Sequence, residues 1–260
     1  MRNNHFIGFF DSGVGGTTVW QEVHRLLPNE STVYLADSKN APYGIKSQQE
    51  IIELSVKNTE FLIRNYPVKM IVVACNTATT NAIAYLRANY NIPFIGVEPA
   101  VKPAALQSKS GVIGVLATQG TLDSQSFHQV VKTYKNTTII EQEGNGLVSL
   151  IESGQIHSPE MTGLLQSYLT PMIAQNIDYL VLGCTHYPLL KNQIKKIVPQ
   201  HVQIIDSGEA IAKRIKTVLE ENKMMNTTSV HQQLFYTNKD TSLLRNLLPE
   251  QAKNVSFLDF

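Results

Sequence analysis

Short, continuous apolar runs alternate along the chain with longer segments in which apolar residues recur at helical spacing. In residues 47–65, for example, Ile51, Leu54 and Leu62 fall near the period of one helix face. The apolar runs lie at residues 6–10, 32–36, 69–74, 93–97, 111–117, 137–140, 179–183 and 202–205. Continuous apolar strands separated by helices are typical of parallel sheets whose faces are covered by helices. The pattern therefore predicts an α/β fold.

The order of these elements repeats at a nearly constant offset. "IGFFDSG" aligns with "IGVLATQG" at an offset of 106 residues, and Cys75 aligns with Cys184 at an offset of 109. "FIGVEPA" aligns with "QIIDSGEA" at an offset of about 110. Chance alignment of apolar strands is the alternative. Two similar halves that face each other would aim both thiols at one cleft, because ligands of open α/β sheets bind beyond the carboxyl ends of the strands.

The chain after residue 222 departs from this pattern. "ENKMMNTTSVHQQ" is polar and is typical of a surface linker. A short strand in "LFYT" and a helix from Thr241 to Leu248 are predicted to follow it. The pattern does not indicate where these elements join the fold.

Composition narrows the class of protein. Apolar residues make up 43% of the chain and charged residues 17%, as in globular proteins. The formal net charge is +1, so neither nucleic acid nor an anionic membrane surface is expected as a partner. The chain has no run of 18 apolar residues and only a five-residue apolar core before Asp11, so we expect neither a membrane span nor a signal peptide. A cytoplasmic location with two reduced cysteines is the resulting prediction.

The glycine-rich segment "DSGVGGTT" begins with Asp11 at the end of a predicted strand. It is not a Walker A loop, and it lacks the G-x-G-x-x-G spacing of dinucleotide-binding proteins. Either an ordinary strand-to-helix turn or an anion site at the start of the next helix fits the residues. In both cases the Asp11 carboxylate is expected to point into the same cleft as Cys75.

Cys75 follows an apolar strand and precedes a helix in "ACNTATTNA". We expect the positive end of that helix to lower the pKa of the thiol. Asn76 and Thr77 can cap the helix or hold a carboxylate. The alternative is that Cys75 is a small buried apolar residue.

"GCTHYP" repeats this arrangement with Cys184, Thr185 and His186. A structural zinc site needs four ligands, and no other cysteine or nearby histidine is available, so no metal is predicted. His186 beside a thiol fits an acid–base partner better than a metal ligand. Two other segments carry no local signal of function: the loop "NAPYGIKS", with Tyr43 and Gly44, and the short helix that ends near Glu152.

Four segments together resemble the glutamate racemases of the aspartate/glutamate racemase family. They are "FFDSGVGGTTV", "DSKNAPYG", "VVACNTATT" and "VLGCTHYPLL", in this order over about residues 6–190. The histidine at position 186 resembles the glutamate enzymes, since related aspartate racemases tend to carry an acidic residue at this position. Asn40 departs from the pattern because many relatives have arginine at that position, which affects loop contacts but not the cysteine chemistry.

The resemblance implies racemisation of glutamate without a cofactor, by two cysteines on opposite faces of the substrate. Cys75 would deprotonate D-glutamate and Cys184 would deprotonate L-glutamate. Asp11 would assist Cys75, and His186 together with Glu152 would assist Cys184. The residues that would hold the substrate are Asp11, Ser12, Tyr43, Gly44, Asn76, Thr77, Thr185 and His186.

The same resemblance implies two similar three-layer α/β domains with mostly parallel sheets, facing each other across a central active-site cleft. The first would comprise residues 1–98 plus 208–260 and carry Cys75, and the second residues 99–207 with Cys184. A homodimer is expected, and the product D-glutamate would supply peptidoglycan synthesis in a bacterial cytoplasm.

Other functions remain open at the level of sequence. One is racemisation of aspartate or another amino acid, or decarboxylation by a relative that uses one cysteine. A second is a binding protein that keeps the fold without turnover. A third is a redox protein with a disulfide, although a disulfide would bring the sulfurs too close together to leave room for a substrate.

Overall fold

The structure is a computed structural model that describes residues 5–260. The strands of this range are β1 (Phe6–Asp11), β2 (Thr32–Ala36), β3 (Val68–Val73), β4 (Phe94–Gly96), β5 (Val112–Ala117), β6 (Thr138–Glu143), β7 (Tyr179–Gly183), β8 (Gln203–Ile205), β9 (Gln233–Thr237) and β10 (Val255–Phe257). The predicted strands are confirmed, with ends that differ by at most three residues.

Helices connect the strands of each sheet. They are α1 (Thr17–Leu26), α2 (Gln48–Asn65), α3 (Asn76–Asn89), α4 (Val101–Gln107), α5 (Gln119–Leu122), α6 (Gln125–Thr133), α7 (Leu147–Glu152), α8 (Pro159–Ala174), α9 (Lys191–Ile197), α10 (Gly208–Glu221) and α11 (Ser242–Leu247). Three short 3₁₀ turns are η1 (Tyr43–Ile45), η2 (Tyr187–Leu190) and η3 (Pro249–Asn254). The helix predicted for residues 47–65 begins one residue later, because Ser47 and Glu50 form a capping box at its start.

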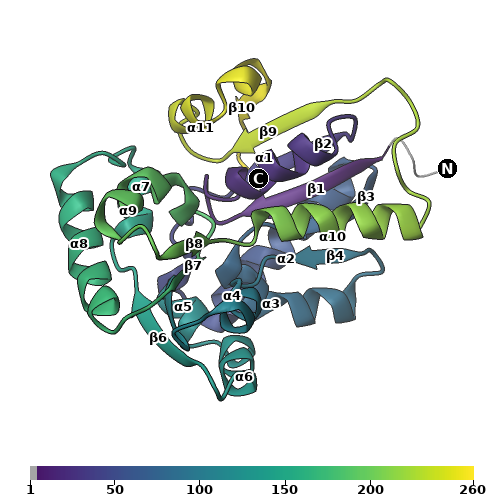
Figure 1. The fold of residues 1–260 in the computed structure, drawn as a ribbon. Helices are drawn as coiled ribbons and strands as arrows, with labels where there is room; N and C mark the ends of the chain where they lie inside the picture. The colour runs from purple at the N-terminus through teal and green to yellow at the C-terminus, as the bar shows by residue number, and fades with distance from the viewer. Residues whose placement is uncertain (1–4) are drawn as a thin grey trace.

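Two parallel sheets organise the molecule (Figure 1). The first has the strand order β10-β9-β2-β1-β3-β4 and the second β6-β5-β7-β8. All paired strands run parallel. The order β2-β1-β3-β4 is thus repeated as β6-β5-β7-β8, which confirms two halves of similar build and argues against chance alignment. In the repeat, β3 corresponds to β7, and the two cysteines follow these strands.

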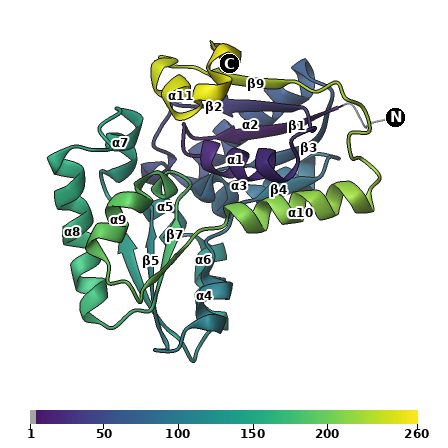
Figure 2. The same ribbon diagram turned by 45° about the horizontal axis from the view of Figure 1, so that its top comes forward.

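The C-terminal elements complete the first sheet. Strand β9 pairs with β2, and β10 pairs with β9, so residues 233–257 extend the sheet that residues 6–96 begin. Helix α10, which leads back from the second half, packs against α1 (Figure 2). This strand membership supports the division of the chain into residues 1–98 plus 208–260 and residues 99–207, which stays a prediction.

Helices cover both faces of each sheet. On the first sheet, alternate strand residues point to α1 and α10 on one face and to α2 and α3 on the other. On the second sheet, one face packs against α7, α8 and α9, and the other against α4 and α6. The core under α1 and α10 continues into the core under α7, α8 and α9, so the two halves share one apolar cluster. Within residues 5–260 no helix is long and apolar enough to cross a membrane.

A buried ion pair closes the end of the first sheet that lies away from the cysteines. Lys69 Nζ, at the start of β3, lies 2.6 Å from Glu30 Oε2 and 2.7 Å from the carbonyl oxygen of Met224. The backbone N–H of Asn226 donates to Glu30 Oε1 at 2.8 Å. These contacts hold the segment that leads from α10 back to the sheet.

Candidate active site

The two cysteines occupy equivalent places in the two halves. Cys75 lies two residues after the end of β3, and Cys184 directly follows β7. Both thiols are free, and they are 4% and 7% exposed, respectively. No disulfide joins them in this arrangement. Since the thiols are almost inaccessible, a substrate can reach them only after the structure around them opens.

A chain of hydroxyl and carboxylate groups leads away from Cys75. The Sγ atom lies 3.6 Å from Ser12 Oγ, and Ser12 Oγ donates to Asp11 Oδ1 at 3.1 Å. The sequence predicted that Asp11 lies beside Cys75, and the hydrogen-bonded route between them runs through Ser12. A proton on Cys75 can therefore interact with the Asp11 carboxylate through one hydroxyl.

The start of α3 lowers the pKa of Cys75, as expected, but burial outweighs this effect. Cys75 is the N-cap of α3, and its sulfur accepts a hydrogen bond from the Ala78 N–H at 3.4 Å. Burial nevertheless raises the pKa of the Cys75 thiol well above its ordinary value, and the nearby Asp11 charge raises it further. The raised pKa favours the protonated thiol of Cys75 in this arrangement.

Asp11 is fully buried and accepts three hydrogen bonds. Its donors are the Ser12 hydroxyl, the Gly16 N–H and the Thr185 hydroxyl, which lies 3.2 Å from Oδ2. Burial raises the pKa of Asp11, and the positive charge of His186 and the Gly16 N–H offset only part of that rise. Because Thr185 belongs to the second half, Asp11 joins the two halves at the site.

Cys184 has a different partner. His186 Nδ1 lies 3.8 Å from Cys184 Sγ, and His186 Nε2 lies 2.7 Å from Glu152 Oε1. Glu152 is the last residue of α7, as the sequence predicted. The Gly15 N–H also points at His186 Nε2, at 3.2 Å, but one nitrogen cannot donate to Glu152 and accept from Gly15. The shorter contact, with the carboxylate, is the stronger one, so we assign the proton to Nε2.

These contacts favour a charged histidine. Burial alone would lower the pKa of His186, but hydrogen bonds and charge from Cys184 and Glu152 raise it well above its ordinary value. Burial alone would raise the pKa of Glu152, but the His186 contact and the Val14 N–H lower it. An imidazolium between two acceptors can stabilise negative charge on the Cys184 sulfur.

The glycine-rich loop binds side chains of the second half. The Val14 N–H donates to Glu152 Oε1 at 2.7 Å. A Cβ atom at Gly13 would lie 2.0 Å from Glu152 Oε1, and one at Gly15 would lie 2.3 Å from His186 Nδ1. The loop therefore holds the chain's own Glu152 carboxylate through the Val14 N–H.

The other residues predicted to bind the substrate lie near the place where the two halves meet. Some of their side chains bind other parts of the protein instead of pointing at the thiols. Asn76 Nδ2 donates to the carbonyl oxygen of Val97 at 2.8 Å, and Thr77 Oγ1 lies 2.8 Å from Thr118 Oγ1 in the second half. Neither side chain caps α3, since Cys75 does. Thr185 contacts Asp11, as described above.

Tyr43 and Gly44 lie in η1. The Tyr43 hydroxyl is buried and donates to Asp37 Oδ2 at 2.5 Å, so its polar end is used within the first half. A Cβ at Gly44 would lie 2.7 Å from Thr118 Cβ, so the loop backbone touches the second half.

Sequence reasoning missed Asp37, which is as buried as Asp11. Its signal is its position: Asp37 directly follows β2, just as Asp11 ends β1. Parallel strands bring their carboxyl ends to one edge of the sheet, so an acidic residue there is a site candidate.

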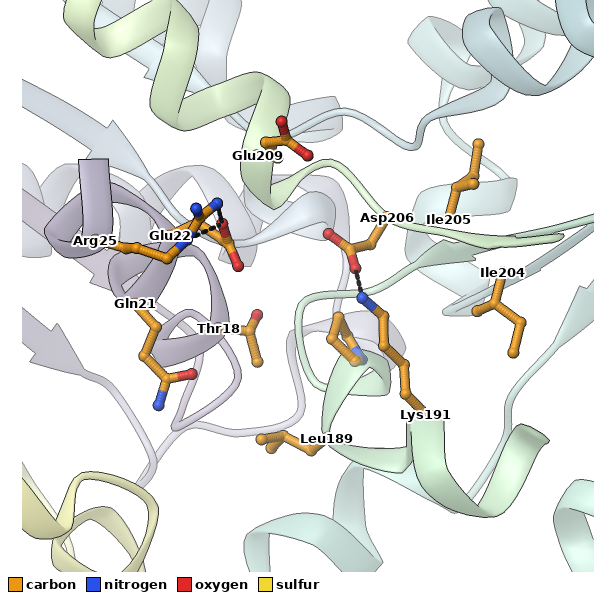
Figure 3. A pocket seen from close by; sticks show the side chains of 11 residues that line it. Thr18, Gln21, Glu22, Arg25, Leu189, Lys191, Ile204, Ile205, Asp206 and Glu209 are labelled. Atoms are coloured by element: carbon orange, nitrogen blue, oxygen red, sulfur yellow. Dashed lines mark hydrogen bonds and ion pairs between the residues drawn. The ribbon is translucent and has the colours of Figure 1, made fainter. Parts of the chain in front are cut away.

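A separate cavity of about 470 Å³ lies between α1, α9 and the segment from β8 to α10 (Figure 3). Neither cysteine lines it. Four of its charged side chains pair with one another, Lys191 with Asp206 and Arg25 with Glu22. Among residues 5–260, no group of three or more His, Cys, Asp or Glu residues could hold a metal ion.

Comparison with known proteins places these features in a family. The sequence model of the Asp/Glu/Hydantoin racemase family matches residues 13–215. The chain is 43% identical over 253 residues to the glutamate racemase of Ectopseudomonas mendocina, covering 95% of this chain and 96% of that relative.

Two solved structures have the same fold over nearly their whole length. The glutamate racemase isoform RacE1 from Bacillus anthracis gives a TM-score of 0.88 at 32% identity, with 99% of this chain and 98% of that chain covered. Escherichia coli glutamate racemase, in complex with L-glutamate and the activator UDP-MurNAc-ala, gives 0.87 at 32% identity, with 98% of each chain covered.

Proposed function

We propose that this chain, which belongs to the Asp/Glu/Hydantoin racemase family, is an enzyme that interconverts L-glutamate and D-glutamate. The similarity to glutamate racemases over almost the whole chain supports this activity. The Escherichia coli relative was crystallised with L-glutamate, which supports glutamate as the substrate of this chain as well.

The observation that carries the proposal is the matched placement of Cys75 and Cys184 after corresponding strands of two similar sheets. Inversion at a tetrahedral carbon requires a base on one face and an acid on the other. Two thiols that approach one cleft from opposite halves meet this requirement. No cofactor is needed, because each proton transfer can use a positioned side chain.

The surroundings of the two thiols support which of them takes a proton from L-glutamate and which gives one. Cys184, next to the His186 imidazolium, would act as thiolate and take the α-proton of L-glutamate. Cys75, whose pKa is raised by burial, would give its proton to the opposite face and yield D-glutamate. The reverse reaction begins after Cys75 has lost and Cys184 has gained a proton.

The other polar residues divide into two kinds. Asp11 would assist the proton transfer of Cys75 through Ser12, whose hydroxyl accepts from Cys75 and donates to Asp11. His186, positioned by Glu152, would assist Cys184. The loops that carry Tyr43, Gly44, Asn76, Thr77 and Thr185 would hold the two carboxylates and the ammonium of the substrate once the halves open.

Three further expectations belong to this proposal. D-glutamate made by the enzyme would supply peptidoglycan synthesis in the bacterial cytoplasm. The chain would form a homodimer, which light scattering on the purified protein tests. The domain boundaries would lie near residues 98 and 208, where the chain crosses between the sheets.

The test is to incubate the purified protein with L-glutamate in D₂O, without added cofactor, while following optical rotation and α-deuterium. We expect rotation to vanish as solvent deuterium enters the D-enantiomer. Aspartate in a parallel reaction should exchange far more slowly. If aspartate exchanges and glutamate does not, the substrate assignment is wrong; if neither exchanges, the chain is a binding protein or acts on another substrate.

A further inference from the structure

Asp37 is the centre of a buried polar network beside the site. Its Oδ1 accepts hydrogen bonds from Asn40 Nδ2 at 2.7 Å and from Asn238 Nδ2 at 2.6 Å. Its Oδ2 accepts from the Tyr43 hydroxyl at 2.5 Å. The side chain of Asp37 is completely buried, so each of these contacts is made out of water. A buried carboxylate with three donors fixes all the segments from which the donors come.

Two of these donors, Asn40 and Tyr43, belong to the loop that follows β2. The Tyr43 ring packs in the same apolar cluster as Cys75. Asn58 Nδ2, from α2, donates to the Tyr43 hydroxyl at 3.2 Å, so this hydroxyl is held from two sides. Gly44 follows directly and lies against Thr118 of the second half. The position of Tyr43 therefore decides how the loop packs in the cluster that contains Cys75 and how it meets the second half.

The third donor comes from the far end of the sequence. Asn238 follows β9, and its Oδ1 accepts a hydrogen bond from the Lys39 N–H at 2.9 Å. One buried amide thus binds both the carboxylate and the backbone of the loop. The C-terminal segment, which the sequence pattern could not place, touches the loop that borders the site.

We propose that Asp37 is a positioning residue of the reaction: together with Asn238 it holds Tyr43 and Gly44 in the closed loop over Cys75. This inference rests on the proposed function insofar as the closed loop encloses glutamate. Asn40 has a role in the network because it supplies one of the three donors to Asp37.

The test compares Asp37→Asn with a matched control, Glu30→Gln. Both replace a buried carboxylate with an amide, and the two residues flank the same strand, Glu30 before β2 and Asp37 after it. Two further variants, Tyr43→Phe and Asn238→Ala, remove single donors and leave the charge on Asp37. They keep the test valid if Asp37→Asn fails to fold, and they separate loop opening from a change in local charge.

The first readout needs no turnover: the rate at which iodoacetamide alkylates Cys75, followed by peptide mass spectrometry. We expect about a tenfold faster reaction in Asp37→Asn, since losing hydrogen bonds to a buried charge opens the loop locally. Tyr43→Phe and Asn238→Ala should give smaller increases in the same direction. The second readout is the KM for glutamate, which should rise about tenfold in Asp37→Asn while kcat changes less.

Glu30→Gln should lower the Tm but leave both readouts within about twofold of the wild type, because its contacts lie at the other end of the sheet. Asp37 has only a structural role if Asp37→Asn, or both single-donor variants, behave like Glu30→Gln. If the variants are alkylated faster but the wild type does not racemise glutamate, the role of Asp37 in the loop is supported and the proposed function is rejected.

Discussion

The carboxylate of Glu152 accepts a hydrogen bond from the backbone N–H of Val14 at 2.7 Å, across the junction of the two halves. The same Oε1 atom lies 2.7 Å from His186 Nε2. The histidine beside Cys184 is therefore oriented by a residue of its own half that is in turn held by the glycine-rich loop of the other half. Closure of the halves and completion of the Cys184 site are one structural event.

Gly15→Ala should strongly reduce racemisation. The new Cβ would overlap the His186 ring, which would have to move away from Cys184. Displacement of a catalytic group by about 1 Å can cost about 100-fold in rate, and we expect a loss of kcat of that order. Gly163→Ala is the control: it lies inside α8 with open space around it, and should raise stability by about 0.5–1 kcal/mol with kcat unchanged. A normal kcat in Gly15→Ala would show that the ring has room to adapt.

Replacing either cysteine with serine should remove racemisation in both directions. In the proposed mechanism each thiol would be the base for one enantiomer and the acid for the other, so neither direction should survive the loss of one. General acid–base groups contribute about 10²–10⁴-fold, and we expect a loss in this range or greater, measured by optical rotation with each enantiomer. Near-normal turnover by Cys75→Ser or Cys184→Ser would exclude the two-base mechanism.

Glu152→Gln should impair Cys184 more than Cys75. Losing a hydrogen bond between charged groups costs about 1.5–3 kcal/mol, so kcat/KM should fall about 10- to 100-fold. The enantiomers have equal free energies, so kcat/KM must fall equally in both directions and cannot identify the impaired thiol. The α-deuterium isotope effect on kcat/KM can identify the impaired thiol, because it should rise for L-glutamate and fall for D-glutamate.

His186→Asn should change the two isotope effects in the same directions as Glu152→Gln, by a larger amount. Glu160→Gln, an exposed change in the first turn of α8, should alter neither rate nor isotope effect. An isotope effect that rises for D-glutamate instead would assign Glu152 and His186 to the other thiol.

The contribution of His186 to stability should depend on pH. Its folded-state pKa lies above the ordinary value of 6.5, so the folded protein binds this proton more tightly than the unfolded chain does. The resulting stabilisation is complete below about pH 6.5 and declines as the pH rises through the folded-state pKa. The Tm difference between wild type and His186→Asn should therefore be larger at about pH 6 than at about pH 9, as measured by calorimetry. A difference that stays constant or grows with pH would mean that His186 is neutral in the fold.

The sequence alone determined the order of the secondary-structure elements and the positions of the two cysteines in it. Alternating apolar runs and amphipathic segments predicted a parallel α/β fold, and the aligned landmarks predicted two similar halves. The placement of Cys75 and Cys184 after corresponding strands followed from the same pattern, because local periodicity and strand ends are short-range properties that neighbouring residues encode.

The tertiary structure decided what surrounds these groups. It placed β9 beside β2 and β10 beside β9, and it packed Glu152 and His186 against the glycine-rich loop. It also joined Asn238 to Asp37 over 201 residues of chain. It also reversed the expected pKa shift of Cys75, since the helix N-terminus acts locally whereas burial depends on everything packed around the thiol. Contacts between distant segments and the loss of water at the site arise only when the whole chain is folded, and no local pattern carries them.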